Sequence, residues 1–234
     1  MKYIFDNRLA PLTHTFWFLK CSLTDYANAY EHWCKGNGQS LSRSSVEGDL
    51  ESMLLQLQPL TMPPRTVLFV ETNSPDWTAY FDNGTPGGDP YSPVGHLALK
   101  LRTQGAIISA IPNTKKGRNP GTYGAVKFEM YAPEKTAWLN IERAVGFYND
   151  GGPWKFILQG TQQSFEEPEH YTAKRIRDRL PLDLLEKYCA AIGLYPFDPA
   201  FYGNRGVMFR KNDPLPKGHP SLSLEEARKL LGLS

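Results

Sequence analysis

A loop rich in glycine and proline runs directly into a helix start in the stretch "DNGTPGGDPYSPVGHLALKL", residues 82–101. Gly-rich loops before helices hold phosphate when consecutive backbone N–H groups and a nearby Lys or Arg face one anion. Here Asp89 follows the glycines, and the prolines lack an N–H, so the loop is unsuited to phosphate. His96, in the first turn of the helix, would be a general base if Asp89 oriented its ring.

The same stretch also suits the recognition of another protein. Ser92 and Pro93 form an N-cap and a first-turn proline, which would fix one end of the loop and present Asp82, Asp89 and Tyr91 in a defined array. A plain surface connector, whose glycines and prolines only set turn geometry, is the simpler interpretation.

A second candidate is the turn "YNDGGPWKF", residues 148–156, between two aromatic-rich segments. Its Asp-Gly-Gly tip is typical of a hairpin, and Trp154 would anchor a partner if the tip binds one. Tyr and Trp contribute most at protein interfaces, and acidic side chains suit a basic partner. The candidate partner-binding residues are Trp77, Asp82, Asp89, Tyr91, Asp150 and Trp154.

Basic side chains gather in two places, whose members are Lys115, Lys116 and Arg118 in one loop, and Lys174, Arg175, Arg177 and Arg179 in another segment. Salt bridges to the acidic stretch "FEEPE", residues 165–169, would explain the second cluster, and an RNA-binding patch is the alternative. The chain has 26 Lys plus Arg against 24 Asp plus Glu, a formal net charge of +2. This balance argues against bulk binding of nucleic acid.

No motif identifies a catalytic, metal or cofactor site. The sequence has no GxSxG, HExxH or CxxC pattern, and its three cysteines, Cys21, Cys34 and Cys189, are too few for a disulfide framework. The first residues lack an uninterrupted apolar stretch for a signal peptide, and no run is long enough to span a membrane. We therefore expect a cytoplasmic protein without cofactor or metal.

Hydrophobic periodicity predicts an α+β fold, with a central antiparallel sheet and helices packed on it, as a single domain of residues 1–234. Strands are expected at 13–22, 65–72, 76–82, 105–112, 124–132, 137–148 and 154–165, and helices at 23–36, 46–60, 92–101, 167–179, 180–193 and 223–232. Residues 1–60 would form a strand–helix–helix part, and residues 203–234 a loosely packed tail. The expected core includes Trp17, Leu54, Leu97, Phe128, Leu185 and Ile192.

The central pattern, from "WTAYFDNG" and "SPVGHLA" through "YGAVKFEMYAPE" and "ERAVGFYNDGGPWKFILQG" to "YTAKRIRDRLPLDLLEKYCAAIGL", resembles bacterial immunity proteins. These are compact α+β proteins encoded beside polymorphic toxins and secreted effectors. The resemblance covers about residues 67–201 and carries no catalytic motif. It implies a bacterial, non-enzymatic protein that neutralises a toxin by direct binding.

Two other functions stay open from the sequence. One is an enzyme, a hydrolase or transferase, with a cleft around Asp89 and His96 between the 82–96 loop and the Asp150 hairpin. The other is a regulatory nucleic-acid-binding module that uses the two basic clusters.

Overall fold

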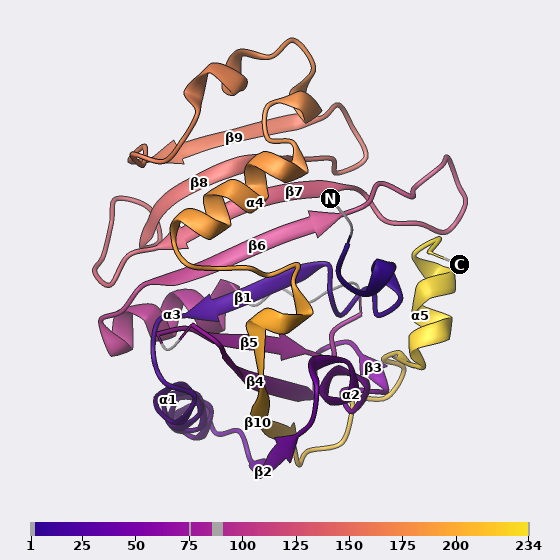
Figure 1. The fold of residues 1–234 in the computed structure, drawn as a ribbon. Helices are drawn as coiled ribbons and strands as arrows, with labels where there is room; N and C mark the ends of the chain where they lie inside the picture. Colours follow the sequence, from indigo (N-terminus) through magenta and orange to yellow (C-terminus); the bar gives the residue numbers. More distant parts are fainter. Residues whose placement is uncertain (1–2, 75, 86–90, 234) are drawn as a thin grey trace.

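The computed structural model describes residues 3–74, 76–85 and 91–233, and a large antiparallel sheet forms its centre (Figure 1). The sheet has nine strands, in the order β2 (Leu41–Glu47), β10 (Tyr202–Lys211), β4 (Thr66–Thr72), β5 (Thr78–Asp82), β1 (Thr15–Leu19), β6 (Gly105–Ile111), β7 (Ala125–Tyr131), β8 (Ile141–Tyr148) and β9 (Lys155–Gly160). A second sheet pairs β3 (Leu60–Thr61) with β11 (Ser221–Leu222).

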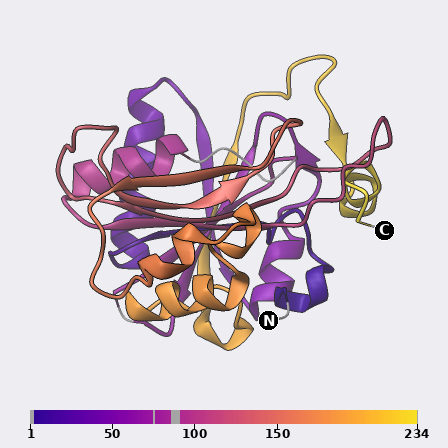
Figure 2. The ribbon, with the colours of Figure 1, turned by 90° about the horizontal axis from the view of Figure 1, so that it is seen from above.

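Helices cover both faces of the large sheet. One face carries α1 (Leu23–Gly36) and α3 (Tyr91–Leu101), and the other carries α2 (Leu50–Leu55) and α4 (Leu182–Ala191). Figure 2 shows α3 and α4 on opposite sides of the strands. The last helix, α5 (Leu224–Leu230), begins at Ser223 with the capping box that Ser223 and Glu226 predict.

Two hydrophobic cores result because side chains alternate across each strand. Along β1, Phe16 and Phe18 point into the core beneath α2 and α4, whereas Trp17 and Leu19 point into the core beneath α1 and α3. All five residues of β1 are buried, as expected for an interior strand covered on both faces.

The α+β prediction is confirmed, and so are the four neighbouring antiparallel strands between residues 105 and 160. Of the predicted core residues, Trp17, Leu54, Leu97, Phe128 and Leu185 are buried, and Ile192 is partly buried. All three cysteines are free. No helix in the described ranges has the length and apolar character that a membrane crossing requires.

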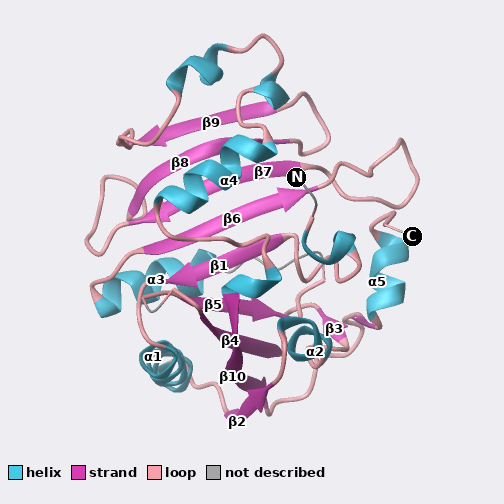
Figure 3. Cartoon of the chain, viewed as in Figure 1, coloured by secondary structure: helices cyan, strands magenta, loops and turns pink. Residues whose placement is uncertain are grey.

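Four local predictions were wrong. Residues 41–47 form β2, so the predicted helix over 46–60 shortens to α2. Residues 202–211, expected in a loose tail, form β10 inside the sheet. The predicted helix over 167–179 is replaced by two short 3-10 turns joined by loops, visible in Figure 3. Helix α3 begins at Tyr91, so Ser92 lies inside it rather than at its cap.

Candidate functional site

The first two residues of the 82–101 stretch, Asp82 and Asn83, are buried and are not exposed for recognition of a partner. Asp82 is 5% exposed, and its carboxylate accepts hydrogen bonds from the Tyr80 hydroxyl at 3.2 Å and the Gly84 N–H at 2.8 Å. Asn83, 1% exposed, accepts from the N–H groups of Arg65 and Thr66 through Oδ1. The expectation that Asp82 faces a partner is therefore corrected, because β5 is an interior strand whose end is covered.

Trp77 is also unavailable at the surface. It is 5% exposed, and its indole N–H donates to the Ile192 carbonyl at 3.2 Å, in the turn that follows α4. Trp77 precedes β5 and Asp82 ends it, so the two residues lie at opposite ends of one short strand. The expectation that Trp77 faces a partner is therefore corrected, because a segment that is distant in sequence covers its ring.

The other predicted partner-binding residues do not form a common surface with Trp77 and Asp82 among the described residues. Asp150 and Trp154 lie in the β8–β9 hairpin, and strands β1, β6 and β7 separate β5 from β8. Asp150 is exposed and forms an ion pair with Lys155. Asp89 lies outside the described residues, and so does the side chain of Tyr91. The six candidates thus do not form one surface among the residues that the structure describes.

A hollow with a volume of about 710 Å³ lies between α1 and α3. Ser22 is the N-cap of helix α1, and its hydroxyl accepts a hydrogen bond from the Asp25 N–H at 3.1 Å. One stripe of α1 packs on the sheet through Tyr26 and Tyr30. The neighbouring stripe lines the groove along the whole helix and consists of Asp25, Asn28, Ala29, His32, Trp33, Gly36 and Asn37.

Helix α3 forms the other wall of the groove with His96, Leu97, Lys100 and Leu101. The rings of Trp33 and His96 lie 5.4 Å apart with an interplanar angle of 30°, at the centre of the groove. Burial lowers the pKa of His96, and the nearby Lys100 lowers it further. His96 is therefore neutral at pH 7 and contributes an aromatic ring to the wall.

A second hollow, of about 460 Å³, continues the groove on the other side of Trp33 and His96. Its far wall is the loop of residues 132–140, which is fixed to α3 because Asn140 donates its side-chain N–H to the Gly95 carbonyl at 3.1 Å. A Cβ on Gly95 would lie 3.3 Å from the Tyr131 ring, so glycine allows this close approach. Leu139 in this loop is 56% exposed, and Trp138 is 45% exposed.

The titratable side chains that line this groove are Asp25, His32, His96 and Lys100. The acid–base pair of His96 with Asp89 stays a prediction, because Asp89 is outside the described residues. Asp82 and the Asp150 hairpin are separated by three strands, so they do not form the walls of the cleft expected for an enzyme. The arrangement suits the burial of an apolar or aromatic side chain from a ligand better than proton transfer.

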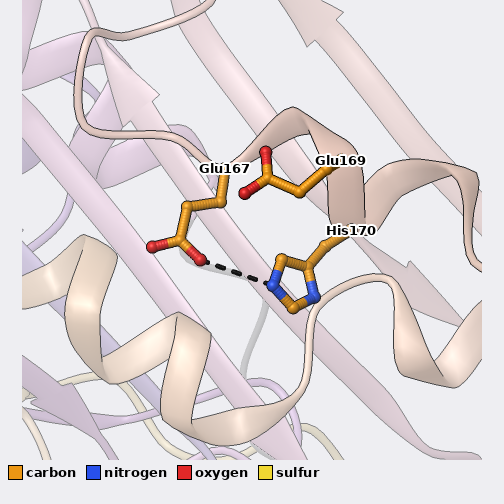
Figure 4. Close-up of side chains that lie close together, drawn as sticks. All are labelled: Glu167, Glu169 and His170. Carbon is orange, nitrogen blue, oxygen red and sulfur yellow. Dashed lines mark ion pairs between the residues drawn. The ribbon is translucent and has the colours of Figure 1, made fainter.

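One group in the described ranges has ligand atoms close enough for a metal ion, namely Glu167, Glu169 and His170 (Figure 4). These atoms all lie within 4.8 Å of one another, and Glu167 forms an ion pair with His170 at 3.4 Å. Glu167 also forms an ion pair with Lys187. The ammonium group already neutralises one carboxylate, so the cluster is explained as a surface ion-pair network.

Comparisons of the chain with protein-family models, with curated proteins and with solved structures found no match.

Sequence reasoning missed the residues that make the groove distinctive. The predicted helix over 23–36 included Trp33 without assigning it to a site, and the predicted strand over 137–148 included Trp138 and Leu139. Strand β8 instead begins at Ile141, because Leu139 and Asn140 have positive φ angles of 50° and 52°. The Asn at position 140 was the available signal, since Asn is enriched in left-handed backbone.

Proposed function

We propose that this chain is a protein-binding protein whose groove between α1 and α3 receives a helical segment of its partner. The observation that carries the proposal is the groove together with the exposed apolar side chains of Trp138 and Leu139 beside it. Tryptophan is enriched where interfaces bury the most area, and exposed apolar groups next to a hollow are typical of docking sites.

The dimensions of the groove suit a helix. Its α1 wall extends from Asp25 to Asn37, and twelve steps of 1.5 Å give a length of about 18 Å, or about three helical turns. A helix of this length presents side chains at positions i, i+3 or i+4, and i+7 to one groove. One of these side chains would enter the larger hollow and another the hollow beside Leu139.

The resemblance to immunity proteins makes a toxin the first partner to test, and cytoplasmic neutralisation by direct binding the first activity. The test is co-expression in bacteria with the protein encoded by the neighbouring gene, with growth and co-purification as readouts. If that protein is the partner, the wild-type chain restores growth and co-purifies with it. Toxicity that persists, with no co-purification, would show that this chain does not neutralise the neighbouring protein.

Matched variants locate the binding surface within the same assay. Leu139 and Leu230 are 56% and 55% exposed, but Leu139 lines the groove and Leu230 lies on α5. We expect Leu139→Ser and Trp33→Ala to weaken binding by about 2 kcal/mol, the scale of an interface hot spot. Leu230→Ser should bind like wild type. Equal effects of the two leucine variants would contradict the groove as the docking site.

A further inference from the structure

The basic segment after β9, residues 174–179, does not form the ion pairs with the acidic stretch of residues 165–169 that the sequence suggests. Glu166 pairs with Arg143, and Glu167 pairs with Lys187 and His170. In the described ranges, no carboxylate lies within ion-pair distance of the charged groups of Lys174, Arg175 or Arg177, which are all exposed. Asp178, in the same segment, is exposed as well and forms no ion pair there.

This segment folds back onto the β8–β9 hairpin, above β9 at the top of Figure 1. The Arg177 guanidinium lies over the Trp154 ring at 5.5 Å. A hollow of about 370 Å³ lies between the hairpin and the basic segment. It is lined by Pro153, Trp154, Arg175, Ile176 and Arg177. No residue of this hollow lines the groove between α1 and α3.

Aromatic rings at this end of the sheet hold Arg177 and three neighbouring cations in place. The Arg179 guanidinium lies over Phe156 at 5.1 Å, and Lys127 and Lys155 lie over the Tyr148 ring at 5.4 and 5.6 Å. A guanidinium stacked on a ring keeps its N–H edges free for the two oxygens of a carboxylate. Stacking also reduces the side-chain entropy that binding would otherwise cost.

We infer that the surface formed by Lys174, Arg175 and Arg177 around Trp154 binds an acidic segment of a partner protein, rich in Asp and Glu. Charge complementarity supports this occupant, because three exposed cations lack a counter-charge. Single-stranded nucleic acid fits less well, since its bases need open aromatic faces and the rings here already carry cations or pack on other rings. This partner segment is acidic, whereas the candidate residue Asp150 led us to expect a basic partner. The Asp150 carboxylate instead forms an ion pair with Lys155.

The test is fluorescence anisotropy with fluorescein-labelled decaglutamate, a neutral decaglutamine peptide and decathymidylate, each titrated with the full chain at two salt concentrations. We expect decaglutamate to bind in a salt-dependent manner and more tightly than either other probe. The double variant Arg175→Gln/Arg177→Gln should bind it about tenfold more weakly.

The matched control is Arg210→Gln/Lys217→Gln, which removes the same charge from two exposed positions, one in β10 and one in the loop between β10 and β11. This control should keep wild-type affinity, and Trp154→Leu, which keeps the net charge, should weaken binding by loosening Arg177. Melting curves verify that every variant is folded. Undetectable binding of decaglutamate, equal loss in the control, or tighter binding of decathymidylate would overturn the inference. None of these outcomes depends on the groove between α1 and α3.

Discussion

Arg143 and Glu166 carry opposite charges in the interior of the protein, with side chains 4% and 0% exposed. The Arg143 Nε–H donates to Glu166 Oε1 at 2.8 Å, and the Tyr171 hydroxyl donates to Oε2 at 2.7 Å. Arg143 Nη2 also donates to Glu166 Oε2, and Nη1 donates to the backbone carbonyls of Gln159 and Gly160. Because the pair is fully hydrogen-bonded, it holds the segment around Glu166, which follows β9, against Arg143 of β8.

Removal of one partner would leave an uncompensated charge in the interior. We expect Glu166→Gln to lower the free energy of unfolding by about 3 to 5 kcal/mol. The double variant Arg143→Met/Glu166→Leu should regain much of this loss, because it removes both charges. Urea denaturation of the three proteins measures the effect. A wild-type midpoint for Glu166→Gln would show that water reaches the pair.

His14 predicts a dependence of stability on pH. Burial lowers its pKa to about 4, with Arg228 contributing, and its Nε2 has no hydrogen-bond partner in the described part of the chain. The unfolded chain binds a proton near pH 6.5 and the folded chain does not, so stability is full above pH 6.5 and falls as the pH decreases toward 4. A shift of this size corresponds to about 3 kcal/mol.

The measurement is the free energy of unfolding at several pH values between 4 and 7 for wild type and for His14→Gln. His96, whose pKa is also lowered, adds a slope of the same sign in both proteins. The variant should therefore show a shallower decline than wild type. Parallel curves would mean that His14 titrates alike in the folded and unfolded chains.

At the scale of the elements, helix α4 closes the core on one face of the sheet. Leu185, at its centre, is 0% exposed, and Tyr188 on the same side lies 5.9 Å from the Phe128 ring of β7. We expect Leu185→Ala to cost about 2 to 5 kcal/mol, from lost apolar burial and the cavity that remains. A denaturation midpoint close to that of wild type would contradict the burial of this face.

The elements that the sequence predicted well have a clear apolar pattern. Helix α1 has the predicted bounds, and strands β4 and β6 are near-continuous apolar runs. Strand β2 was missed because it is an edge strand with mostly exposed side chains and no apolar alternation. Strand β10 contains two glycines and a shift in register, both of which obscure a strand pattern.

The candidate site was less predictable than the fold, because its walls come from separate segments. His96 was identified as a residue of interest, but its neighbour Trp33 lies about sixty residues earlier in the chain and was not a candidate. Trp77 and Asp82 were buried by packing between distant segments. Local turn chemistry identifies a turn and does not show what covers it.

At the scale of the whole molecule, β10 pairs the C-terminal part of the chain with two strands from its first third. It lies between β2 and β4 and pairs with both, so the sheet is incomplete without residues 202–211. We expect a chain that ends at residue 201 to lose cooperative folding.

A chain that ends at residue 212 should fold with a lower melting temperature, because it lacks α5, whose Arg228 donates to the Arg8 carbonyl at 3.1 Å. Cooperative melting of the 1–201 chain would contradict this role of β10.

The measurement that tests the proposed binding function most directly is hydrogen–deuterium exchange of the chain alone and in complex with the partner found by co-expression. We expect slower exchange on binding in α1, in α3 and in the loop of residues 132–140, because these segments line the groove. Exchange in α5 should not change. Unchanged exchange in α1 and α3 with a bound partner would contradict the groove as the site of protein binding.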